Sequence, residues 1–95
     1  MNEEELSKIK SLINELIYSS TKNDGEKPFA ALKSQILQYQ GEIDSYLLGK
    51  LKESVNYARE ASGRVKDKEH WIEMSERSLY TFENGIKREY DLKGE

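Results

Sequence analysis

Residues 51–72 read LKESVNYAREASGRVKDKEHWI and decide how this chain folds. An apolar residue recurs every seven positions through this stretch and beyond it: Leu51, Ala58, Val65, Ile72, Leu79 and Ile86. A seven-residue repeat keeps one face of a helix turned toward a partner. However, the neighbouring column becomes polar at Ser62, and Gly63 can take the left-handed conformation that ends helices. We therefore predict a helical hairpin that turns near Gly63, whereas a continuous helix would indicate an intermolecular coiled coil.

Local signals divide the chain into three predicted helices, at about residues 3–18, 28–62 and 67–90. Asn2 and Glu5 have the spacing of a capping box at the first start. Pro28 suits the first turn of the second helix, because its missing N–H would be unpaired there anyway. Asp67 is the predicted N-cap of the third helix.

Gly41 leaves one alternative open. The apolar phase continues through it from Tyr39 to Ile43, and a single glycine costs only about 1 kcal/mol relative to alanine. We therefore predict one long middle helix with a kink at Gly41. If Gly41 is instead a true turn, the chain has four helices. In both cases the fold class is all-α, a small up-and-down helical bundle.

The composition bounds the class of protein. The 95 residues make a single domain, with a net charge of −3 and 35% charged residues. Strong apolar residues are scarce for a lone globule, which favours stabilisation by a partner, most simply a second copy of the chain. The absence of cysteine excludes disulfides and thiolate catalysis. The acidic N-terminus is unlike a signal peptide and no segment could span a membrane, so we expect a cytoplasmic protein.

The sequence offers little chemistry. His70 is the only histidine, and Asp67 and Glu73 lie three residues to either side of it. A carboxylate-x-x-His step is one element of the di-metal sites of helical bundles, but a symmetric dimer would be needed to complete such a site. A metal-binding bundle is therefore the least favoured hypothesis. No catalytic motif or phosphate-binding loop is recognisable, so we predict a protein that is not an enzyme and holds no cofactor.

Tyrosine is the most informative residue type. The chain has 6 tyrosines and only 2 phenylalanines. Tyrosine suits a boundary between a dry and a wet environment, and it is enriched at protein–protein contacts. The residues that we predict to bind a partner are Tyr39, Tyr46, Tyr57, Trp71 and Tyr80.

A cluster of basic residues gives a second hypothesis. Arg59, Arg64, Lys66 and Lys68 flank the predicted turn, with aromatic residues nearby. Cations interleaved with aromatic rings can bind nucleic acid or another anion. The simpler interpretation is a helix end with a favourable charge distribution. The acidity of the chain as a whole also argues against nucleic acid as the partner.

In size, acidity and helical pattern the chain is similar to bacteriocin immunity proteins, secretion chaperones, antitoxins and phage-encoded inhibitors of bacterial defence. No diagnostic run of residues accompanies this similarity, so it assigns no role to any residue. We expect a non-enzymatic protein-binding module, a small regulator, inhibitor or adaptor that self-associates. Anion binding at the basic turn is the alternative.

Overall fold

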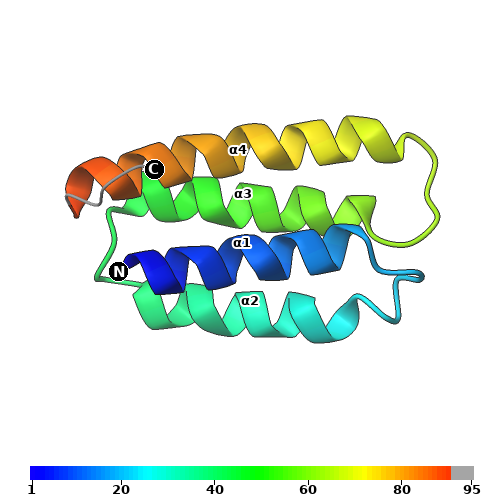
Figure 1. The fold of residues 1–95 in the computed structure, drawn as a ribbon, viewed down its shortest axis with the longest axis horizontal. Helices are drawn as coiled ribbons and strands as arrows, with labels where there is room; N and C mark the ends of the chain where they lie inside the picture. The colour runs from blue at the N-terminus through cyan, green and yellow to red at the C-terminus, as the bar shows by residue number, and fades with distance from the viewer. Residues whose placement is uncertain (91–95) are drawn as a thin grey trace.

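The structure, a computed structural model, describes residues 1–90 as four helices. Their bounds are α1 Glu3–Ile17, α2 Glu26–Tyr39, α3 Ser45–Ala61 and α4 Lys68–Glu89. Successive helices alternate in direction along the long axis of a molecule that measures 38 × 23 × 22 Å (Figure 1). α3 contacts each of the other three helices, most extensively α4, and is the central element. The all-α prediction is confirmed, in its four-helix form.

The residues predicted to start the first two helices lie at helix N-termini. Asn2 Oδ1 accepts a hydrogen bond from the Glu5 amide at 2.8 Å, and Glu5 Oε1 accepts one from the Asn2 amide at 3.0 Å. The predicted capping box is therefore confirmed. Pro28 lies in the first turn of α2, which begins at Glu26, two residues earlier than predicted. Within residues 1–90, no helix combines the length and apolar character that crossing a membrane requires.

The predicted long helix over residues 28–62 is wrong, because the chain reverses direction at Gly41. This glycine has a φ of 83°, a left-handed conformation that few other residues adopt readily. Asp44 then caps α3, where its Oδ2 accepts hydrogen bonds from the amides of Tyr46 at 3.1 Å and Leu47 at 3.2 Å. The apolar phase continues through the reversal because both helices present their apolar residues to the same core. Periodicity alone therefore cannot distinguish a kink from a turn.

The predicted turn near Gly63 is confirmed. α3 ends at Ala61, and Gly63 has a φ of 75°. The Gly63 amide donates to the Ser19 carbonyl at 3.1 Å, and a Cβ on this residue would lie 2.9 Å from the Lys22 amide nitrogen. Gly63 thus ends α3 and also allows the loop between α1 and α2 to pack directly on the turn. The rod that an intermolecular coiled coil would require is not formed.

Asp67 precedes α4 as predicted, but it does not cap the helix with its side chain. Its φ of 60° is left-handed, and its carboxylate accepts no hydrogen bond from the first turn. The backbone carbonyl of Asp67 instead accepts hydrogen bonds from the amides of His70 at 3.0 Å and Trp71 at 3.2 Å. The predicted position is therefore confirmed, whereas the predicted capping interaction is absent.

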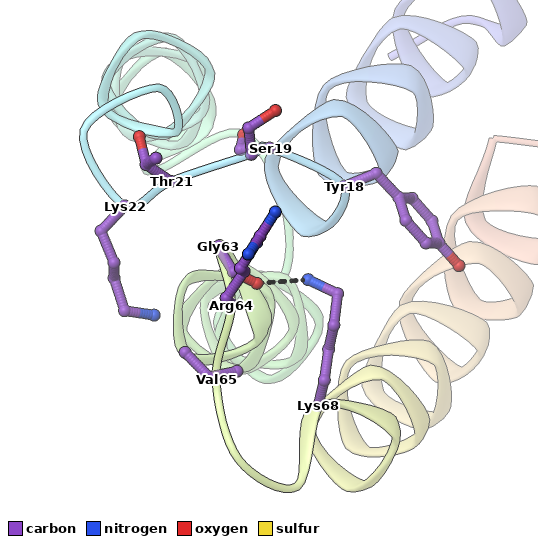
Figure 2. Close-up of a pocket in the computed structure, with 9 residues that line it drawn as sticks. Tyr18, Ser19, Thr21, Lys22, Gly63, Arg64, Val65 and Lys68 are labelled. Atoms are coloured by element: carbon purple, nitrogen blue, oxygen red, sulfur yellow. Dashed lines mark hydrogen bonds between the residues drawn. The ribbon is translucent and has the colours of Figure 1, made fainter.

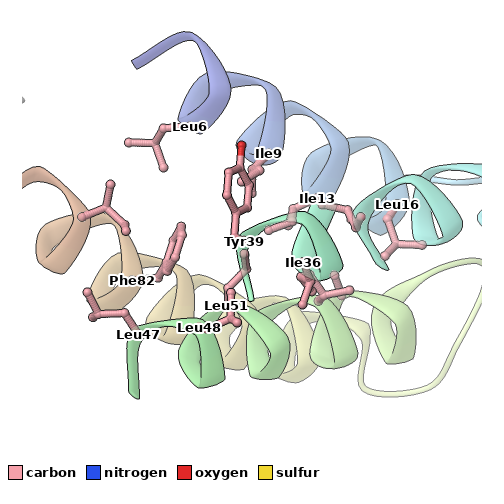
Figure 3. Packing of buried hydrophobic residues seen from close by; sticks show 14 of the residues in the cluster. Leu6, Ile9, Ile13, Leu16, Ile36, Tyr39, Leu47, Leu48, Leu51 and Phe82 are labelled. Carbon is pink, nitrogen blue, oxygen red and sulfur yellow. The ribbon is translucent and has the colours of Figure 1, made fainter. Parts of the chain in front are cut away.

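All four helices contribute to one hydrophobic core (Figure 3). Its largest fully buried apolar side chains are Ile9, Ile13, Leu16, Leu32, Leu51, Val55, Phe82 and Ile86. Of the heptad column, Leu51, Ala58 and Ile86 are buried, whereas Ile72 and Leu79 are only partly buried at the edge of the core. A single chain thus encloses a continuous core, even though strong apolar residues are few.

Small residues allow α3 and α4 to approach each other closely. Ser54 and Ser75 are fully buried, and each Oγ donates to the backbone carbonyl of the other residue at 2.8 Å. Further along the contact, Gly85 lies so close to Leu47 that an added Cβ would stand 2.3 Å from Leu47 Cδ2. We call this contact the α3–α4 seam. The buried residues of α4 include Ser75, Ser78 and Gly85, whereas Ile72 and Leu79 are only partly buried.

Glu83 joins α4 to α1. Its Oε2 accepts a hydrogen bond from Lys10 Nζ at 2.9 Å and forms an ion pair with Lys87 Nζ at 3.0 Å. Burial by itself would raise the pKa of the Glu83 carboxyl, but the two ammonium groups outweigh this effect and hold the pKa below its usual value. The carboxylate therefore remains charged and links the first helix to the last.

Two glycine-to-alanine substitutions test the α3–α4 seam. Gly49 is also within a helix, but a Cβ there would meet no atom within 4 Å, so Gly49→Ala should stabilise the protein by about 1 kcal/mol. Gly85→Ala has the same propensity gain but should lose more, because overpacking costs about 1–3 kcal/mol. Urea denaturation should place Gly85→Ala at least about 1 kcal/mol below Gly49→Ala. Equal stability of the two variants would show that the seam is not closely packed.

Candidate functional site

Four of the five residues predicted to bind a partner lie on the α3–α4 hairpin. Tyr46 and Tyr57 come from α3, and Trp71 and Tyr80 come from α4. Tyr46 is 63% exposed and Tyr80 is 67% exposed, so most of each ring is in solvent. Tyr57 and Trp71 are partly buried and stack on each other, with ring centroids 6.0 Å apart. The hairpin therefore carries one aromatic pair and two separate exposed rings.

Two adjacent grooves lie beside these aromatic residues on the hairpin. Tyr46 and Tyr80 line the first groove, and Tyr57 and Met74 line the second. Thr81 lines both grooves. Trp71 lines neither groove but stacks on Tyr57. We call the following residues the aromatic face: Tyr46, Tyr57, Trp71, Met74 and Tyr80.

Tyr39, the fifth predicted residue, is a core residue and does not belong to the aromatic face. Its side chain is 4% exposed, and Figure 3 shows its hydroxyl directed toward α1. The hydroxyl makes no hydrogen bond within residues 1–90, although the Glu5 carboxyl is close enough to affect its ionisation. Burial, with added repulsion from Glu5 and Glu42, raises the pKa of Tyr39 to about 12. We predicted that Tyr39 binds a partner, but its side chain is buried in the core and is not available at the surface.

The basic turn, residues 59–68, contains cations that bind backbone carbonyls of the same chain (Figure 2). Lys68 Nζ donates to the carbonyls of Ile17 at 2.7 Å, Ala61 at 2.5 Å and Gly63 at 2.9 Å. These carbonyls lie at the C-terminal ends of α1 and α3, where they lack helical partners. Burial lowers the pKa of the Lys68 ammonium, and the nearby Lys22 ammonium lowers it further. Lys68 therefore joins two helix ends to the start of α4.

Lys22, from the loop between α1 and α2, binds the end of α3 in a similar way. Its Nζ donates to the carbonyls of Arg59 at 2.8 Å, Glu60 at 3.1 Å and Ser62 at 3.0 Å. We call Lys22 and Lys68 the lysine clamp. Sequence reasoning missed Lys22, because its acceptors lie in a distant segment that only the fold brings near.

Arg59 is also occupied by contacts within the chain. Its guanidinium donates to the Lys22 carbonyl at 3.0 Å and to Glu26 Oε2 at 2.6 Å. Arg64 and Lys66 are exposed, and their side chains make no hydrogen bond or ion pair within residues 1–90. The four cations predicted to bind an anion are therefore not equivalent, since two of them serve the structure.

An open groove of about 1000 Å³ lies beside the turn. Lys22, Arg64 and Lys68 line it together with hydroxyl side chains from the loop between α1 and α2. An ammonium group has three donors, and the lysine clamp already uses them on carbonyls. Among the described cationic side chains that line this groove, only Arg64 makes no hydrogen bond or ion pair within residues 1–90.

The possible metal ligands do not gather in the structure. Asp67, His70 and Glu73 are exposed at the start of α4, and the His70 ring contacts Trp71 with centroids 4.9 Å apart. Within residues 1–90, no group of three or more histidine, aspartate or glutamate residues is placed to hold a metal ion. The described part of a single chain thus offers a metal no complete set of ligands.

Comparison of the chain with protein families, with curated proteins and with solved structures found no match. A functional proposal must therefore rest on the residues and surfaces of this chain.

The lysine clamp can be tested by removing each ammonium group. Lys68→Met should lower the free energy of unfolding by about 1–3 kcal/mol, since partly buried carbonyls lose a charged donor. Lys22→Met should cost less, about 1 kcal/mol, because water can reach most of its acceptors. Lys66→Met is the matched control and should leave stability unchanged within about 0.5 kcal/mol. Equal effects of all three substitutions in urea denaturation would contradict the clamp.

The raised pKa of Tyr39 should make the stability of the protein fall at alkaline pH. A phenol with a raised pKa in the folded state contributes stability that is present below pH 10 and is lost as the pH rises toward 12. Tyr39→Phe should remove this loss between pH 10 and 12. It should also leave stability at pH 7 unchanged or higher by about 1 kcal/mol, because an unpaired buried hydroxyl is removed. Tyr80→Phe is the control, and parallel pH profiles for both variants would argue against this assignment.

Proposed function

We propose that the protein is a non-enzymatic protein-binding module that uses the aromatic face. The observation that carries this proposal is the position of Tyr46 and Tyr80, two largely exposed aromatic rings that line one groove. Tyrosine and tryptophan bury large areas with few rotatable bonds and dominate the binding energy of many interfaces. Tyr57, Trp71 and Met74 extend the same surface along the hairpin.

The rigidity of the hairpin supports this role. The α3–α4 seam fixes the two helices through buried serine hydrogen bonds and close contact at Gly85. The aromatic side chains are thus displayed on a backbone that needs little reordering when a partner binds, which reduces the entropic cost of association. A small regulator, inhibitor or adaptor is the class of protein that we infer.

The same face suits self-association, the form of partner that the sequence favours. A twofold dimer uses one patch on both subunits, so exposed rings from one copy would pack on those of the other. We propose that the first partner to test is a second copy of the chain, with which it would form a cytoplasmic dimer. Anion binding at the basic turn receives less support, because Lys68 and Arg59 already serve backbone carbonyls and Glu26.

A double variant tests the aromatic face. Tyr46→Ala with Tyr80→Ala should weaken capture of protein partners from the native host, or dimer formation, by about tenfold or more, since each interface tyrosine contributes about 1–2 kcal/mol. Tyr18→Ala is the matched control, because Tyr18 is 62% exposed but lies on another part of the molecule. Quantitative mass spectrometry measures capture, and light scattering measures mass.

The outcomes separate the hypotheses once circular dichroism shows that each variant is folded. Loss of partner or dimer only in the double variant supports the aromatic face. Equal behaviour of the double variant, Tyr18→Ala and the unmodified chain would exclude it. Loss on Arg64→Glu, with a steep dependence on salt, would favour anion binding instead.

A further inference from the structure

A second groove, between α2 and α3, has a different character from the aromatic face. Its floor is formed by the buried Ile36 and Val55, and its walls include the partly buried Phe29 and the exposed Leu37. Leu37 is 67% exposed and adds apolar surface beside the partly buried Phe29. The groove has a volume of about 360 Å³ and is open rather than enclosed. We call it the α2–α3 groove.

Cationic side chains border this apolar surface. Lys33 from α2 and Lys52 from α3 line the groove, and neither forms an ion pair within residues 1–90. Lys33 Nζ and Arg59 Cζ lie 5.1 Å and 4.9 Å from the centroid of the Phe29 ring. The other lining residues in the described part of the chain include no carboxylate. In a chain of net charge −3, this surface is locally positive.

We propose that the α2–α3 groove binds an amphipathic helix of a partner protein, with an apolar stripe flanked by carboxylates. The lining residues run from Phe29 in α2 to Gln40, the residue that follows α2, about 16 Å at 1.5 Å per residue, which matches about three turns of a helix. A helix of that length presents apolar side chains at three- and four-residue intervals to such a groove. Carboxylates on its flanks would meet Lys33 and Lys52, which form no ion pair within residues 1–90.

The openness of the groove favours a peptide helix over a free fatty acid. Small amphiphiles bind in pockets that bury most of their surface, whereas this groove is open to solvent. The α2–α3 groove does not depend on the aromatic face, which lies over the α3–α4 hairpin. A molecule with both surfaces would act as an adaptor, with α3 contributing to each.

Two synthetic peptides of about 14 residues test the proposal with the full chain. Both carry leucines at helical spacing; one has glutamates flanking the leucine stripe, and the other has lysines in their place. NMR titration should show the glutamate peptide shifting amides of α2 and α3 along the groove. It should bind about tenfold or more tightly than the lysine peptide, because its carboxylates pair with Lys33 and Lys52 whereas the lysine peptide places like charges beside them.

Charge reversal supplies the matched variants. Lys33→Glu with Lys52→Glu should weaken the glutamate peptide about tenfold and strengthen the lysine peptide. Lys8→Glu with Lys66→Glu changes the net charge equally at exposed sites away from the groove, and should have little effect. Leu37→Ala should weaken both peptides, since this exposed leucine supplies apolar contact without supporting the core.

Several results would overturn the proposal. These are equal affinity for the two peptides, an unchanged affinity in the Lys33 and Lys52 variant, or shifts confined to the aromatic face. Binding of vesicles containing anionic lipid, with the peptides inactive, would also overturn it and assign the groove to a membrane surface.

Discussion

The close approach of α3 and α4 is the constraint on which the rest of the structure depends. Ser54 and Ser75 can be buried at this contact because each hydroxyl donates to the carbonyl of the other, so no polar group is left unpaired. Glycine at position 85 leaves space for Leu47. With the small residues directed inward, the large rings at the hairpin's outer surface remain partly or largely exposed. The close packing of α3 on α4 and the exposure of these rings thus have the same origin.

The charges of the protein are divided between structural and surface roles. The lysine clamp binds the carbonyls at the end of α3, where the helix dipole is negative. Arg59 binds the Lys22 carbonyl and the Glu26 carboxylate. Lys10 and Lys87 hold the carboxylate of Glu83 between α1 and α4. By contrast, Lys33 and Lys52 have no ionic partner in the described part of the chain. The paired charges stabilise the fold, whereas Lys33 and Lys52 give the α2–α3 groove a positive surface.

Residue identity alone could not assign these roles. The six tyrosines favour an interface on grounds of composition alone. In the structure, however, Tyr39 is buried in the core, while Tyr46 and Tyr80 are exposed. A cluster of basic residues predicts an anion site, but Lys68 and Arg59 find acceptors within the chain. Both differences arise from contacts between segments far apart in the sequence. The aromatic face was therefore predictable in most of its members, whereas the α2–α3 groove and the lysine clamp were not.

By itself, the sequence determined the helical class, the capping box at Asn2, the place of Pro28 and the turn at Gly63. These features depend on local backbone preferences and on short-range periodicity, which neighbouring residues encode. Only the tertiary structure decided that Gly41 reverses the chain, because apolar spacing is the same for a continuous helix and for two helices that share a core. It also decided which face of α4 packs on α3. Ser75 and Gly85 lie there because the distance between the helices, set by the whole bundle, excludes larger side chains.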